Sequence, residues 1–227
     1  MRLICAIFIL LLASMTSVQC QQTAEDWLNR GVALGSQGKY DDAIKAFDEA
    51  IRLDPNDAMA WNNKGYALYS QGKYEEAITA YDEGIGLDPN DAIAWINKGN
   101  ALNSQGKYDE AIKAFDEGIR LDPNDAMVWN NKGNALNSQG NFDEAIKACN
   151  EAIRLDPKFA WPWNNKGNAL GNQGKYDEAV KAFDEAIRFD PNDAMAWNNK
   201  GLALEALGKT TEANASFAKA KELGYNG

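Results

Sequence analysis

A thirteen-residue phrase, LDPNDAMAWNNKG at residues 53–65, recurs with small changes at Leu87, Leu121, Leu155 and Phe189. The interval between successive copies is 34 residues each time. This fixed period constrains the fold more than any other feature, because each unit of a repeat array packs only on its neighbours. The chain of 227 residues is therefore expected to form a linear stack of equivalent units.

Each unit carries two helical patterns. With Ala24 as position 1, units of 34 residues give predicted repeats at 24–57, 58–91, 92–125, 126–159, 160–193 and 194–227. Trp at position 4 and Gly at position 8 share one helix face with position 11, and a second apolar face follows Tyr74 in the second half of its unit. A glycine between the halves, such as Gly106 or Gly140 in the next unit, is expected to interrupt the helix there.

The recurring phrase is predicted to join one unit to the next. Pro cannot continue a helix, so the LDP segment ends the second helix of each unit. The Asp that follows, Asp57 or Asp91 for example, is then placed to cap the next helix. At the beginning of the array, Thr23 and Asp26 have the spacing of a cap with an acidic residue in the first turn.

These positions strongly resemble the tetratricopeptide repeat, whose period is 34 residues and whose signature is Trp, Gly, Ala, an aromatic residue and Pro at the same offsets. The resemblance covers residues 24–227 and implies an all-α fold, a right-handed α-solenoid of six helix-turn-helix repeats. In the sixth repeat, Thr210, Asn214 and Lys221 replace apolar residues of the earlier repeats, which indicates a polar C-terminal cap and a monomer.

Residues 1–20 lie outside the repeats and have the pattern of a cleavable signal peptide. An apolar run from Leu3 to Ala13 follows Arg2 and is too short to span a bilayer. Cleavage after Cys20 would leave Gln21 first, and the mature chain would be secreted or held at the cell surface. Lipidation of Cys20 and an uncleaved anchor are the alternatives.

Composition excludes several classes of function. The net charge is −10 and the basic residues are interleaved with acidic ones, which argues against nucleic acid and anionic lipid as partners. The chain contains no His, so the usual catalytic triads and zinc sites are absent. A calcium loop starting at Asp54 would need Gly and Glu where Met59 and Gly65 stand. We therefore expect no enzymatic activity, no cofactor and no metal.

An asparagine row is the main candidate binding feature. Position 6 lies on the face of the first helix roughly opposite the Trp–Gly face, and it is Asn in all repeats: Asn29, Asn63, Asn97, Asn131, Asn165 and Asn199. Position 9 adds Asn100, Asn134 and Asn168. Related arrays, such as the superhelix of O-GlcNAc transferase, hold the substrate backbone with Asn in this column, and the resemblance implies the same role here. The alternative is that these amides bond to one another or to water.

Position 2 supplies apolar side chains, either as contacts for a bound chain or as packing between adjacent first helices: Met59, Ile93, Met127, Trp161 and Met195. Because positions 2, 5 and 6 hold no Lys or Arg, the family's clamp for C-terminal carboxylates is not expected. The predicted function is a scaffold that binds a protein or peptide segment in its concave groove. There are two alternatives. One is a structural spacer at the cell surface that binds no ligand in the groove, and the other is an intracellular adaptor, if residues 1–20 are not a signal peptide.

One joint between repeats is irregular. LDPKFAWPW places Phe159, Trp161 and Pro162 beside Trp163, and Cys149 stands where other repeats have Phe or Tyr. Cys149 is expected to be a buried, inert thiol. Phe159 either fills the space that Cys149 leaves or contributes, with Trp161 and Trp163, to a ligand site.

Overall fold

The computed structural model describes residues 22–225, and this part of the chain is a solenoid of twelve α-helices. The first helix of each repeat is α2 (Ala24–Ser36), α4 (Ala58–Ser70), α6 (Ala92–Ser104), α8 (Ala126–Gln139), α10 (Ala160–Asn172) or α12 (Ala194–Ala206). The second is α3 (Tyr40–Leu53), α5 (Tyr74–Leu87), α7 (Tyr108–Leu121), α9 (Phe142–Leu155), α11 (Tyr176–Phe189) or α13 (Thr210–Glu222). The all-α solenoid that the repeat pattern predicts is therefore confirmed.

The helices start and stop where the recurring phrase predicts. The second helices of repeats 1 to 5 end at the residue before Asp-Pro. The Asp57 side chain accepts hydrogen bonds from the backbone N–H groups of Met59 and Ala60. Asp91 and Asp193 cap α6 and α12 in the same way. Thr23 and Asp26 form a reciprocal capping box at α2. Within each repeat the turn contains a glycine in the left-handed region, with φ of 76° at Gly106 and 90° at Gly140.

Close contact between the two helices of a repeat depends on the glycine at position 8 of each repeat. A Cβ on Gly99 would lie 2.6 Å from Cε1 of Phe115, whose side chain is completely buried. Gly31, Gly65, Gly167 and Gly201 face Phe or Tyr rings in the same way, and Gly133 faces the Sγ of Cys149. The glycine thus makes room for a ring of the second helix.

Successive repeats are joined by polar contacts of the first helix. The indole Nε1 of Trp129 donates to the carbonyl oxygen of Pro123 in the preceding loop at 3.2 Å, and four other repeats repeat this bond. Lys200 forms an ion pair with Asp184 of the preceding repeat at 2.7 Å. Lys64, Lys98 and Lys132 make the same pair, and each of these three is the only charged side chain of its helix.

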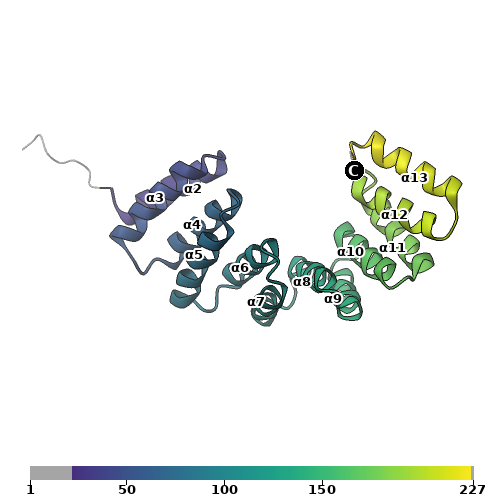
Figure 1. Ribbon diagram of the computed structural model, residues 1–227. Helices are drawn as coiled ribbons and strands as arrows, with labels where there is room; N and C mark the ends of the chain where they lie inside the picture. The colour runs from purple at the N-terminus through teal and green to yellow at the C-terminus, as the bar shows by residue number, and fades with distance from the viewer. Residues whose placement is uncertain (1–21, 226–227) are drawn as a thin grey trace, which may run out of the picture.

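The stack curves into an arch (Figure 1). The helices α4, α6, α8 and α10 lie on the inner side of the arch, while α5, α7, α9 and α11 lie on the outer side. No helix among residues 22–225 is long and apolar enough to cross a membrane. The predicted signal peptide, residues 1–20, lies outside the described residues.

Candidate functional site

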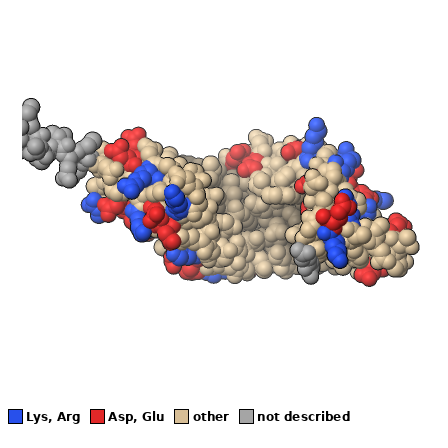
Figure 2. Space-filling view, turned by 90° about the horizontal axis from the view of Figure 1, so that it is seen from above, with Lys and Arg blue, Asp and Glu red and all other residues tan. Residues whose placement is uncertain are grey.

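The concave surface of the arch is formed by the first helices and is nearly free of charge. Figure 2 looks onto this side and shows Lys, Arg, Asp and Glu gathered towards the two ends, with an uncharged hollow between them. Amide and apolar side chains therefore determine what the middle of this groove can bind.

The apolar residues at position 2 project from the first turn of their helices. The relative exposure of Met59, Ile93, Met127, Trp161 and Met195 ranges from 39% to 67%. Side chains of this size remain exposed on a folded surface at a cost in unfavourable hydration. They form a row, with one side chain in each of repeats 2 to 6, that is accessible to another chain.

The asparagines at position 6 have different surroundings along the array. Asn29 is exposed, and the other five, from Asn63 to Asn199, are half-buried. Asn63 donates to the carbonyl oxygen of Met59 in its own helix at 2.8 Å. Asn97 makes no hydrogen bond through its side chain to any described residue, so its whole amide is available.

Amide groups of neighbouring repeats bond to one another in the second half of the groove. Asn165 Nδ2 donates to Asn130 Oδ1 at 2.8 Å, Asn130 Nδ2 donates to Asn131 Oδ1 at 3.3 Å, and Asn131 Nδ2 donates to Asn100 Oδ1 at 3.0 Å. This series runs across three repeats in one direction. It leaves the Oδ1 atom of Asn165 without a donor among the described residues, so this oxygen can accept from a ligand.

Further pairs of amides bond across repeats, outside this series. Asn199 Nδ2 donates to Asn164 Oδ1 at 3.2 Å, and Asn103 Nδ2 donates to Asn134 Oδ1 at 3.3 Å. Asn168 is half-buried and makes no such bond to a described residue. The bonds between amides are those expected if the asparagines bond to one another. The unpaired Oδ1 of Asn165 and the free amide of Asn97 are what binding of a ligand backbone would need.

Sequence reasoning missed the contribution of position 5. Asn130 and Asn164 are only 4% and 7% exposed, and both accept a hydrogen bond from position 6 of the next repeat. Position 5 lies three residues after position 2 and four before position 9, so it belongs to the same helix face. In most repeats the recurring phrase has Asn at both positions 5 and 6, and this was the sequence signal that position 5 also contributes to the groove.

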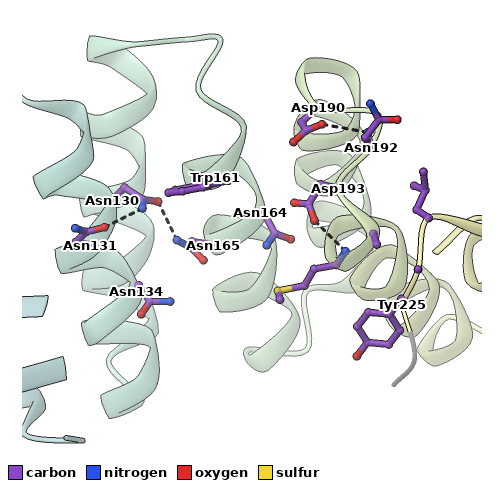
Figure 3. Close-up of a pocket in the computed structure, with 14 residues that line it drawn as sticks. Asn130, Asn131, Asn134, Trp161, Asn164, Asn165, Asp190, Asn192, Asp193 and Tyr225 are labelled. Carbon is purple, nitrogen blue, oxygen red and sulfur yellow. Dashed lines mark hydrogen bonds between the residues drawn. The ribbon is translucent and has the colours of Figure 1, made fainter. Parts of the chain in front are cut away.

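A pocket of about 670 Å³ opens at the C-terminal half of the groove (Figure 3). Trp161, Asn164 and Asn165 of α10 line it, together with amides of α8, the loop before α12 and the segment from Leu223 to Tyr225. The Phe159 ring lies against Trp161, with 5.7 Å between the ring centroids. Of the aromatic cluster in the irregular joint, Trp161 is thus the member that reaches the pocket.

The cysteine of the irregular joint lies away from solvent. Cys149 is completely buried in α9, as expected, and burial raises the pKa of its thiol to about 12. A thiol with this pKa stays protonated at neutral pH and is a poor nucleophile. Its place in the structure is that of a small core residue.

The comparisons with known proteins agree with this architecture. The chain matches the family model of the tetratricopeptide repeat over residues 28–92, 96–158 and 164–225. No match was found among curated proteins. The crystal structure of MamA is 28% identical, with a TM-score of 0.63, and the match covers 70% of this chain and 93% of MamA.

Two other solved structures extend the likeness. YrrB, described as a tetratricopeptide repeat protein with an unusual peptide-binding site, is 25% identical with a TM-score of 0.62, covering 80% of this chain and 93% of YrrB. A tetratricopeptide repeat protein from Parabacteroides merdae shares the fold at 17% identity, with a TM-score of 0.79, covering 90% of this chain and 81% of the other. Such proteins are generally non-enzymatic scaffolds for protein interaction. With the family match spread over most of its length, this chain belongs to the tetratricopeptide repeat family.

Proposed function

We propose that this protein is an exported, non-enzymatic scaffold that binds an extended peptide or protein segment along the concave groove. The observation that supports it best is the combination of an exposed apolar row at position 2 with available amides at position 6 on the same surface. A surface that served only as a spacer would have no need of exposed Met, Ile and Trp side chains in successive repeats.

The repeat spacing suits an extended ligand. Neighbouring helices pack about 10 Å apart, and an extended chain rises about 3.3 Å per residue. One amide from each repeat can therefore meet about every third residue of a bound strand. The free amide of Asn97 can both donate and accept, and the Oδ1 of Asn165 can accept from a backbone N–H.

Solved relatives support a peptide as the ligand. The YrrB structure is described as having a peptide-binding site, and its likeness to this chain extends over 80% of the chain. The absence of His from the sequence also removes the commonest general base. We extend peptide binding, without catalysis, to this protein.

Selection from a library of short random peptides tests the proposal, with residues 21–227 as bait. We expect extended peptides to be enriched and the Asn97→Ala variant to bind them roughly tenfold more weakly, since a directed hydrogen bond from a half-buried amide is lost. Asn214→Ala is the matched control, because Asn214 is an exposed asparagine of α13. If no peptide is enriched, or if both variants bind equally well, the groove is not the binding site and the spacer function is favoured.

Export is part of the same proposal and has a separate test. The predicted signal peptide, residues 1–20, supports it. Expression of the full chain in a secreting host should give a mature protein that begins at Gln21 when its intact mass is measured. A mature protein that retains Met1 inside the cell would instead support the intracellular adaptor.

A further inference from the structure

The pocket at the C-terminal half of the groove contains carboxylates and no base. Asp190 and Asp193 line it, and none of its lining residues is Lys or Arg. Two basic residues close to these carboxylates in the sequence are already engaged, because Arg188 pairs with Glu185 and Lys200 pairs with Asp184. Neither pocket carboxylate has an ion-pair partner among residues 22–225. The pocket therefore presents uncompensated negative charge to whatever enters it.

Asp190 differs from its equivalents in the other repeats. It is half-buried, whereas the residues at the same position of the earlier repeats are exposed: Asp54, Asp88, Asp122 and Asp156. Across the pocket, the last repeat has Gly224 and Tyr225 where the earlier repeats have Asp and Pro. Carboxylate interactions strengthen as water is excluded, so a charge here acts more strongly than one on an open loop.

The carboxylates also have free acceptor atoms. Asp190 Oδ1 accepts from the backbone N–H of Asn192, and Asp193 Oδ1 accepts from the N–H groups of Met195 and Ala196. The Oδ2 atom of each has no donor among the described residues. At the joint between repeats 2 and 3, by contrast, Asp91 Oδ2 accepts from an amide of the preceding first helix.

A buried amide with an unused donor points into the same pocket. Asn164 is 7% exposed and lines the pocket, and its Oδ1 accepts from Asn199. Its Nδ2 donates to no described residue, so its N–H groups are free donors at the wall of the pocket. An incoming chain that brings a carbonyl oxygen would satisfy it. This is an observation independent of the carboxylates, and it also indicates a ligand.

Aromatic rings complete the pocket. Trp161 lines it and is 53% exposed, and Tyr225 lies at the opposite side (Figure 3). Ring faces attract cations and also contact the methylene groups of long basic side chains. Carboxylates, rings and an unpaired amide donor together fit a lysine or arginine residue within a peptide.

We propose that this pocket, defined by Trp161, Asn164, Asp190, Asp193 and Tyr225, accepts the side chain of a lysine or arginine of the bound segment. Asp190 and Asp193 receive the cationic group, the rings enclose its apolar stem, and Asn164 Nδ2 donates to a backbone carbonyl of the ligand. The inference rests on the proposed peptide binding and adds the residue that the groove selects.

The test uses peptides enriched from the random library and measures their affinity by fluorescence anisotropy. We expect the enriched peptides to contain Lys or Arg, and replacement of that Lys by norleucine, which keeps the apolar stem, to weaken binding roughly tenfold. For the double variant Asp190→Asn/Asp193→Asn, the two peptides should bind equally. Asn caps helices as well as Asp, so this variant keeps its fold. The matched control is Asp122→Asn/Asp125→Asn, which removes the same charges at another joint and should preserve the tenfold preference.

The outcomes separate the two proposals. Peptides that bind the groove without Lys or Arg, or norleucine peptides that bind as well as their Lys parents, overturn the cation pocket and leave peptide binding intact. An equal loss of the preference in both double variants would mean that the overall negative charge, and not this pocket, selects basic peptides. If no peptide is enriched, peptide binding itself fails and the pocket assignment fails with it.

Discussion

Replacing Gly99 by Ala should destabilise the array, although Ala is the better helix former. The added Cβ would meet three ring atoms of Phe115 at 2.6, 2.7 and 3.0 Å. Carbon atoms pack favourably at about 3.5–4.0 Å, so the ring or the helix must shift by nearly 1 Å. Overpacking of this kind costs about 1–3 kcal/mol, which exceeds the gain of about 1 kcal/mol in helix propensity. We expect a net loss of up to about 2 kcal/mol.

The same substitution at Gly86 supplies the control. Gly86 lies within α5, and a Cβ there would meet nothing within 4 Å. Gly86→Ala should therefore stabilise the protein by roughly 0.5–1 kcal/mol. The two changes are chemically identical and are predicted to have opposite signs.

Urea titrations followed by circular dichroism at the helical band measure both variants. Because repeat arrays can depart from two-state unfolding, the transition midpoints are compared first. A double-mutant cycle with Phe115→Leu should remove most of the cost of Gly99→Ala, since the ring that the Cβ meets is then absent. If Gly99→Ala raised the midpoint as Gly86→Ala does, the close approach of ring and backbone would not be the reason for Gly at this position.

Two further predictions concern the core and the loops. The thiol of Cys149 has a pKa of about 8.5 in the unfolded chain and of about 12 in the folded protein. Below the unfolded pKa, the thiol is neutral in both states and the pH does not affect stability through this group. Above it, the unfolded chain is favoured because its thiol ionises, so the free energy of unfolding should fall as the pH rises towards the folded pKa. Equilibrium unfolding at several pH values should show this fall to be steeper than in Cys149→Ala, and equal slopes would contradict it. Trp129→Phe should cost roughly 0.5–1.5 kcal/mol more than Trp27→Phe in thermal unfolding, because Trp129 donates to the carbonyl oxygen of Pro123, whereas Trp27 makes no such bond to a described residue. Equal costs would show that this hydrogen bond contributes nothing.

The architecture could be predicted from the sequence because its determinants are local and repeated. Asp57 caps its helix from one residue away, and Gly106 turns the chain within its own repeat, so neither depends on distant residues. The burial of Cys149 followed from its place in the repeat, where other units have a ring. In each case the interval of 34 residues transfers the reasoning from one repeat to all.

The groove was less predictable because its contacts join different repeats. A helical wheel places Asn130 and Asn165 on related faces, but only the curvature of the stack decides that they meet across α8 and α10. The pocket likewise combines Trp161 with Tyr225, which are separated by almost two repeats in the sequence. Such juxtapositions depend on the angle between successive units, and no single repeat encodes that angle.

The irregular joint shows how the array accommodates an aromatic residue beside the pocket. Phe159 replaces the Asp that caps α4, α6, α8 and α12, and it provides no side-chain cap for α10. At the third helical position, where Ala60 and Ala196 donate to their caps, α10 has Pro162, which has no N–H to leave unsatisfied. One of the two donors orphaned by the loss of the cap is thereby removed, which lowers the cost of Phe159. Loss of a helix cap that is compensated in this way is expected where function requires another residue at the position. Here Phe159 packs on the ring of Trp161, the aromatic side chain with which α10 lines the pocket.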